Sequence, residues 1–136
     1  MRGILADVNA EGQLSRLVGV LLQSDTWSQL WADFDLDIES FRSLGFDRQM
    51  PDDELWRACQ GDGLVLVTGN RNKDGPTSLE AVIGAENTPT SLPVITVANL
   101  KRVTTDRAYA EATALRLLER LIDMPLLLGA GRLYIP

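Results

Sequence analysis

The sequence of 136 residues contains no histidine and only one cysteine, Cys59. Without histidine, the chain cannot use a Ser-His or Cys-His pair in catalysis, an imidazole general base or an imidazole metal ligand. A single cysteine can form neither an internal disulfide nor a thiolate zinc site. Because Cys59 lies in an apolar helical pattern, we interpret it as a small buried residue rather than as a reactive thiol.

Long apolar runs and an excess of positive charge are also missing. No stretch has the length of a membrane span and no apolar signal segment precedes the first strand, so we expect a cytoplasmic protein without membrane contact. The 13 Lys and Arg residues are outnumbered by 19 Asp and Glu residues. Such a chain does not favour non-specific binding of phosphate backbones, so an RNA partner would need a local basic patch. Candidates are Arg71 and Lys73, and further on Lys101, Arg102 and Arg107, although ordinary solvated surface charge is the more usual explanation of such residues.

The remaining composition and pattern predict one domain covering residues 1–136. Hydrophobic residues make up 45% of the chain and charged residues 24%, which is sufficient for a core. The predicted strands comprise residues 3–6, 34–39, 64–67, 94–97 and 133–135. The predicted helices comprise residues 10–23, 27–34, 51–60, 79–83 and 105–123, and loops are expected at 41–49, 70–77 and 87–93.

Local signals refine the helix boundaries. Asn9 is placed to cap the first helix, and Thr26 with Gln29 has the spacing of a capping box for the second. A proline at residue 51 followed by acidic residues is typical of a helix start, and Pro125 is expected to end the long helix. The aromatic face of the second helix predicts either a core contact or a dimer interface.

Strands that alternate with helices predict a three-layer α/β/α fold with a mostly parallel sheet of four to five strands. The uninterrupted aliphatic run at 64–67 indicates burial on both faces of that sheet. If the strand at 3–6 is central, the chain order reverses between it and the strand at 64–67. Ligands collect at such a point, and the arrangement would bring Asp7 close to Asn70.

Three short motifs carry polar groups to this predicted edge. They are Leu5-Ala6-Asp7-Val8-Asn9, Pro51-Asp52-Asp53-Glu54-Leu55 and Val67-Thr68-Gly69-Asn70-Arg71-Asn72. In order and spacing over roughly the whole chain, they resemble the small PIN-like proteins. These are relatives of the PIN-domain ribonucleases that act as toxins in bacterial toxin-antitoxin pairs.

The resemblance implies a metal-dependent nuclease site. In that family, clustered acids bind Mg²⁺ or Mn²⁺, which positions a water for attack on a phosphodiester. Carried over, Asp7 and Asp52 are the catalytic carboxylates and metal ligands. The remaining residues implied are Asn70 and Asn72 as further metal ligands, Asn9, Asp53, Thr68 and Asp74 in support, and Arg71 and Lys73 as contacts to the substrate.

This sequence departs from the family pattern at several ligands. Val8 stands where a glutamate is usual, and Asn70 and Asn72 stand where the family has two aspartates. An amide still offers an oxygen, but each change removes one negative charge. At about 4 Å and an effective dielectric of about 20, one charge is worth about 4 kcal/mol of attraction to a cation.

The same residues also have purely structural explanations. Asn9 suits a helix cap, Asp52 and Asp53 suit the positive end of a helix, and the two asparagines suit a turn after a strand. Asp7 is harder to explain in this way, because an acid that ends a buried strand is costly unless it is paired or bound.

Three functions are therefore open from the sequence. The first is a PIN-like binding or regulatory module whose nuclease chemistry is weakened or lost. The second is a working Mg²⁺- or Mn²⁺-dependent ribonuclease, which as a toxin would have an antitoxin-like protein partner. The third is a structural subunit that forms a homodimer through the tryptophan helix or through residues 126–128.

Overall fold

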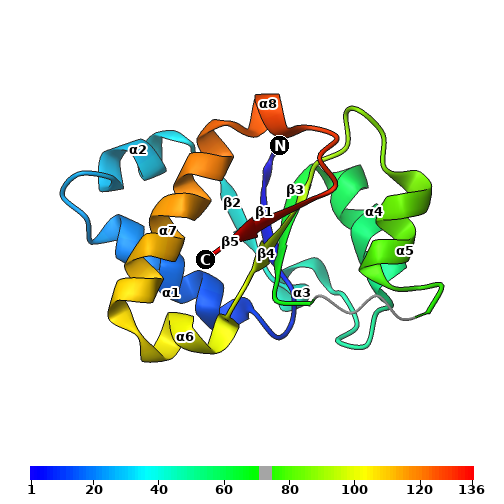
Figure 1. Ribbon diagram of the computed structural model, residues 1–136, viewed down its shortest axis with the longest axis horizontal. Helices are drawn as coiled ribbons and strands as arrows, with labels where there is room; N and C mark the ends of the chain where they lie inside the picture. Colours follow the sequence, from blue (N-terminus) through cyan, green and yellow to red (C-terminus); the bar gives the residue numbers. More distant parts are fainter. Residues whose placement is uncertain (71–74) are drawn as a thin grey trace.

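The computed structural model describes residues 1–70 and 75–136, and these residues form a three-layer α/β/α fold (Figure 1). The strands are β1 (Gly3–Ala6), β2 (Asp37–Glu39), β3 (Leu64–Thr68), β4 (Val94–Val97) and β5 (Arg132–Ile135). The helices are α1 (Glu11–Leu22), α2 (Ser28–Asp33), α3 (Phe41–Leu44), α4 (Asp52–Asp62), α5 (Leu79–Glu86), α6 (Leu100–Thr105), α7 (Arg107–Ile122) and α8 (Met124–Leu127). The predicted fold class is confirmed.

The five described strands are all parallel and lie in the order β2-β1-β3-β4-β5. Gly3 pairs with Asp37 on one side and with Leu64 on the other, so β1 lies between β2 and β3. This is the predicted arrangement of the first three strands. The chain order therefore reverses between β1 and β3, and the carboxyl ends of these two strands meet at one edge of the sheet.

Alternate residues of the strands build two separate cores. Ile4 and Val65 face the core that contains α1, α6 and α7, whereas Leu5 and Leu66 face the core that contains α4 and α5. Figure 1 shows these two groups of helices on opposite faces of the sheet. Every residue of β1 and β3 is buried. The prediction that helices cover both faces of the sheet at the aliphatic run 64–67 is therefore confirmed.

The first two helices begin differently from the prediction. The N-cap of α1 is Ala10, no side chain caps it, and Asn9 is exposed, so the predicted cap is wrong. Its place is taken by a turn in which the Ala10 amide donates to the Asp7 carbonyl at 2.8 Å. No side chain caps α2 either, and the predicted capping box is absent.

Short helices occupy regions where the sequence predicted a loop or no helix. The region predicted as the loop 41–49 contains α3, which Ser40 and Ser43 start with a reciprocal capping box. The predicted helix 105–123 corresponds to α7, which begins two residues later because the backbone at Asp106 is extended. The preceding helix α6 was not predicted. Pro125 lies in the first turn of α8 rather than just after the long helix, a position that its missing amide hydrogen allows.

The second predicted strand is shorter than expected, and its aromatic neighbours are split between core and surface. Only residues 37–39 pair with β1, at the edge of the sheet, and Ile38 is 45% exposed. Trp31 of α2 is 7% exposed and belongs to the core. The face of α2 that holds Trp31 is therefore covered within the chain itself.

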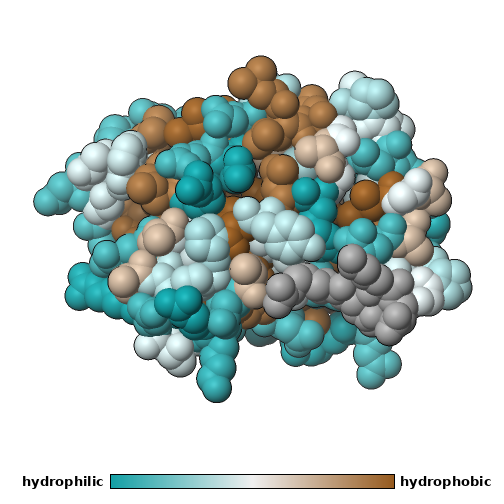
Figure 2. Space-filling model, in the orientation of Figure 1, coloured by the Kyte–Doolittle hydropathy of each residue, from teal (hydrophilic) through white to brown (hydrophobic). Residues whose placement is uncertain are grey.

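Apolar side chains are exposed around α8. Met1, Ile122 and Leu128 line a shallow groove, and Leu126 beside it is 84% exposed. Figure 2 shows apolar residues gathered at the edge of the molecule where α8 lies in Figure 1. No helix in the described ranges has the length and apolar character of a membrane span.

Candidate functional site

A pocket of about 450 Å³ opens at the edge where β1 and β3 end. Asp7, Val8 and Asn9 line it from the loop after β1, Asp52 lines it from the start of α4, and residues 68–70 line it from the end of β3. The sequence predicted that these three segments converge, and the structure brings them together. Parallel pairing of β1 with β3 is the cause, since it places both strand ends at one edge.

Asp7 is held by donors from both strands. Its Oδ1 accepts from the Val8 amide at 2.7 Å, and its Oδ2 accepts from the Thr68 hydroxyl at 2.8 Å. Thr68 is completely buried, and its Oγ1 accepts in turn from the Asn70 amide at 2.9 Å. The half-buried carboxylate that the sequence left unexplained is thus hydrogen-bonded within the protein.

Asp52 is the first residue of α4, and its Oδ2 accepts from Asn70 Nδ2 at 2.8 Å. Its pKa is raised above the ordinary value of 3.8, chiefly by burial. The hydrogen bond from Asn70 and the charge of Arg132 lower this pKa, whereas the negative charges of Asp7 and Asp53 raise it. Asp7 and Asp52 are therefore close enough to interact electrostatically within one pocket.

Arg132 does not line the pocket but holds Asn70, the residue that follows Gly69 after β3, through its backbone carbonyl. Its side chain is only 7% exposed, and its Nε is 2.6 Å from Glu80 Oε1. Its Nη1 donates to the Asn70 carbonyl at 2.8 Å and to Thr96 Oγ1 at 2.6 Å. Nη2 is buried without a hydrogen-bond partner among the described residues. Sequence reasoning missed Arg132, because nothing in the residues around it indicates that its side chain crosses to β3.

The other predicted site residues divide into three groups. Asn9 is exposed and lines the pocket. Asp53 is not among the lining residues of the pocket, and its carboxylate bonds the Glu54 amide at 2.9 Å and Arg57 Nη1 at 3.4 Å. The remaining predicted residues, Arg71, Asn72, Lys73 and Asp74, lie outside the described residues.

Arg48 is a second lining residue that the sequence did not predict. It is exposed and comes from the segment between α3 and α4. Its position provides a positive charge at a pocket where, among the residues that the structure describes, the other charged lining groups are Asp7 and Asp52. No local signal could have found it, because the predicted loop 41–49 has no regular pattern that fixes where its side chains lie.

The side chains present fit a divalent cation only in part. Asp7, Asp52 and Asn70 carry the oxygen atoms that Mg²⁺ and Mn²⁺ prefer. Within residues 1–70 and 75–136, however, no group of three or more acidic, histidine or cysteine side chains is arranged to hold a metal ion. Among the described lining residues, the negative charge comes from Asp7 and Asp52, and each of these carboxylates already accepts a hydrogen bond from the protein.

Chemically, the pocket combines two interacting carboxylates, an amide, a buried hydroxyl and an arginine at its wall. Such an arrangement can bind a polar molecule, and a carboxyl with a raised pKa can exchange a proton with it. Comparison with family models, with curated proteins and with solved structures finds no match to this chain.

Proposed function

We propose that this chain is a PIN-like domain whose acidic pocket has lost most of its metal-dependent nuclease chemistry and now serves as a binding or regulatory module. One observation carries the proposal: Asn70 Nδ2 donates to Asp52 Oδ2 at 2.8 Å. The resemblance implies an aspartate at position 70. A neutral amide there donates to a remaining carboxylate instead of adding a second charge.

Hydrogen bonding explains why this pocket would bind a divalent ion weakly. The Thr68 hydroxyl and the Asn70 amide already satisfy one oxygen of each carboxylate. An ion that binds Asp52 Oδ2 would compete with this side-chain amide for the oxygen, and charge-assisted hydrogen bonds of this kind contribute about 1.5–3 kcal/mol. Asp7 and Asp52 would hold the ion, and a bound Mg²⁺ or Mn²⁺ would supply the activation of water.

A working ribonuclease is the second candidate, and the raised pKa of Asp52 favours it. Carboxyls with perturbed pKa values, next to another acid in a cleft, are typical of active sites. In this alternative Arg48 would contact a phosphate of the RNA. Either function would be exercised in the cytoplasm, and a toxin of this kind would bind an antitoxin-like protein partner.

Manganese titration tests the proposal directly. The wild-type chain should bind Mn²⁺ weakly in calorimetry, and Asp7→Asn should abolish the heat. Asn70→Asp should raise the affinity at least about tenfold, because it restores a charge beside Asp52. Unchanged affinity in Asn70→Asp would mean that residue 70 does not face the ion, and would refute the proposal.

Gln23→Glu is a matched control for added charge. Residue 23 follows α1, whose 12 residues extend about 18 Å from the end that faces the acidic pocket. The variant should bind Mn²⁺ like the wild type. Cleavage of labelled RNA with Mn²⁺ separates the two candidate functions. If the chain is a binding module, the wild type should cleave the RNA no faster than Asp7→Ala does. Faster cleavage by the wild type would favour the ribonuclease.

A structural homodimer is a third proposal, supported by the apolar surface around α8. Leu126 is 84% exposed, whereas Trp31 of the tryptophan helix is buried in the core. If copies of the chain associate, the segment 126–128 is therefore the better candidate surface. Leu126→Asp should then convert a dimer to a monomer in sedimentation velocity, and a wild-type monomer would exclude this proposal.

A further inference from the structure

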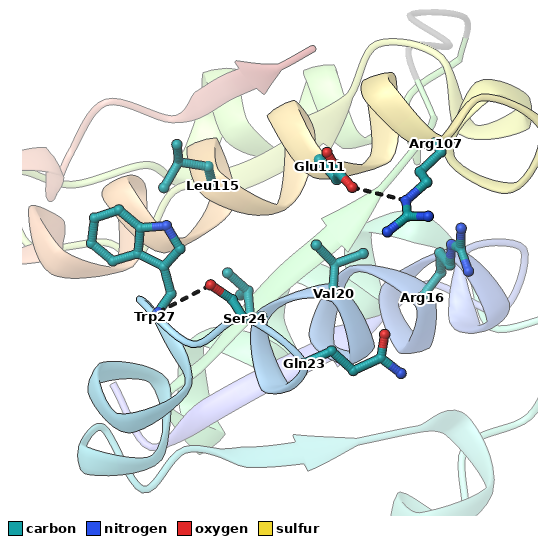
Figure 3. Close-up of a pocket in the computed structure, with 9 residues that line it drawn as sticks. Arg16, Val20, Gln23, Ser24, Trp27, Arg107, Glu111 and Leu115 are labelled. Atoms are coloured by element: carbon teal, nitrogen blue, oxygen red, sulfur yellow. Dashed lines mark hydrogen bonds and ion pairs between the residues drawn. The ribbon is translucent and has the colours of Figure 1, made fainter.

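A second pocket, of about 540 Å³, lies between α1 and α7 (Figure 3). It shares no lining residue with the acidic pocket at the end of β1 and β3. Neither the motifs that resemble the PIN-like proteins nor the function proposed above involves it. Its volume falls within the range of about 300–1,000 Å³ that is common for pockets that bind small molecules.

The two helices supply its walls at helical spacing. Arg16 and Val20 lie four residues apart on α1, and Arg107, Glu111 and Leu115 lie at intervals of four on α7. Residues spaced in this way share one helix face. Each helix therefore lines the pocket with an arginine followed, one or two turns later, by an aliphatic residue.

One end of the pocket carries an uncompensated positive charge. Figure 3 shows Arg16 and Arg107 gathered at this end. Arg107 Nε lies 3.0 Å from Glu111 Oε1, with both side chains largely exposed, and Arg16 forms no ion pair with any residue that the structure describes. Two arginines and one glutamate leave a local excess of one positive charge in a chain whose formal net charge is -6.

The other end is apolar and contains an aromatic ring. Trp27 and Leu115 line the pocket at that end, and both are half-buried (Figure 3). The Trp27 amide donates to Ser24 Oγ at 3.2 Å, which fixes the backbone from which the indole projects. An indole face beside an aliphatic side chain is a surface against which a flat ring can stack.

We propose that this pocket binds a small organic monoanion in which a carboxylate is attached to a flat apolar ring. The carboxylate would lie at Arg16 and Arg107, because guanidinium groups match its two oxygens. The ring would lie between Trp27 and Leu115. A single negative charge balances the local excess, whereas the second charge of a phosphate monoester would not be balanced.

Calorimetry with 2-naphthoate and its uncharged analogue 2-naphthamide tests this assignment. The two probes share a ring and differ by one charge, so the amide should bind at least about tenfold more weakly. Equal binding of both probes, or no heat from 2-naphthoate at millimolar concentration, would overturn the proposal. Tighter binding of uridine 5′-monophosphate than of 2-naphthoate would overturn the choice of a monoanion.

Substitutions locate the binding within the pocket. Arg16→Gln should weaken 2-naphthoate binding about tenfold, because it removes the unpaired cation. Arg116→Gln is the matched control: Arg116 belongs to α7 and pairs with Glu119 at 3.1 Å, but it does not line the pocket. Equal losses in the two variants would show a general charge effect and overturn the assignment. Both arginines are exposed, so both variants should fold normally.

Discussion

The buried hydroxyl of Thr68 donates to the carboxylate of Asp7, with Oγ1 2.8 Å from Oδ2, and so joins the end of β3 to the residue that follows β1. Thr68→Val removes this hydroxyl with little change in volume. The free energy of unfolding should fall by about 1–3 kcal/mol, because Asp7 loses a donor and the backbone N–H of Asn70 loses its acceptor. Urea unfolding measures the change. In a double-mutant cycle with Asp7→Asn, simply additive losses would contradict this coupling.

The raised pKa of Asp52 predicts a pH-dependent effect of Asp52→Asn. Below pH 3.8 this carboxyl is protonated in both the folded and unfolded chains. As the pH rises above 3.8, Asp52 ionises in the unfolded chain before it ionises in the folded chain, whose pKa is higher. The free energy of unfolding of the wild type therefore falls until the pH has passed the folded pKa. Asp52→Asn does not lose this stability, because the side chain of the variant does not ionise. Its amide oxygen can still accept the hydrogen bond from Asn70. In EDTA, its stability relative to wild type should be greater at about pH 7 than at about pH 4. If the difference in stability between the variant and the wild type were the same at both pH values, the raised pKa of Asp52 would be contradicted.

Gly69 is required by the close approach of Leu100. A Cβ at position 69 would lie 2.6 Å from Leu100 Cγ and closer still to Cδ1. Gly69→Ala should therefore lower the free energy of unfolding by about 1–3 kcal/mol through overpacking. The loss should shrink in the Leu100→Ala background, where the clashing atoms are gone. Equal losses in both backgrounds, measured by urea unfolding, would show that Leu100 moves aside at little cost.

The ion pair of the buried Arg132 with the partly exposed Glu80 should matter far more than a more exposed pair of the same length. Arg132→Met should lower the free energy of unfolding by about 3 kcal/mol, because it removes the hydrogen bonds that Arg132 donates to Glu80, Thr96 and the Asn70 carbonyl. Arg57→Met is the control, since Arg57 lies 2.6 Å from Glu86 but is half exposed. Its loss should stay below about 1 kcal/mol. Similar losses in both variants would contradict the importance of burial.

The thiol of Cys59 should be unreactive in the folded chain. Burial raises the pKa of this thiol to about 12, and the residue is 2% exposed. Because the thiolate is the reactive form, Ellman's reagent at about pH 8 should label the native chain very slowly and the urea-unfolded chain rapidly. If the native chain were labelled as fast as free cysteine, Cys59 could not be buried in the folded chain.

Much of the sheet was predictable because burial on both faces has a simple sequence signature. Residues 3–6, 64–67 and 94–97 are almost wholly aliphatic, and all are buried in strands. The boundaries that failed depend on other forces. The four residues of α3 are too few for a helical period. The start of α7 is set by Asp106, whose side chain caps the helix by accepting from the Tyr109 amide, and the predicted start at residue 105 does not take this capping signal into account.

The acidic pocket was predictable only as far as strand order determines it. Asp7, Thr68 and Asn70 line one pocket because β1 and β3 end at the same edge of a parallel sheet, and Asp52 joins them because α4 begins there. Arg132 contributes through a side chain that crosses β4 to reach β3, and no spacing within the sequence encodes such a contact. The pocket between α1 and α7 likewise depends on how two helices pack, which their separate patterns do not specify.

The pairing of β1 with β3 also has a kinetic consequence. The Asp7–Thr68 hydrogen bond spans 61 residues of chain, and parallel strands can form such contacts only after a long loop has closed. Folding dominated by distant contacts is slow, so we expect refolding on the millisecond-to-second scale. A ligand that contacts both Asp7 and Asp52 would bind only the folded chain, because the two residues come together only when the sheet is complete. Its binding would therefore raise the melting temperature as its concentration increases.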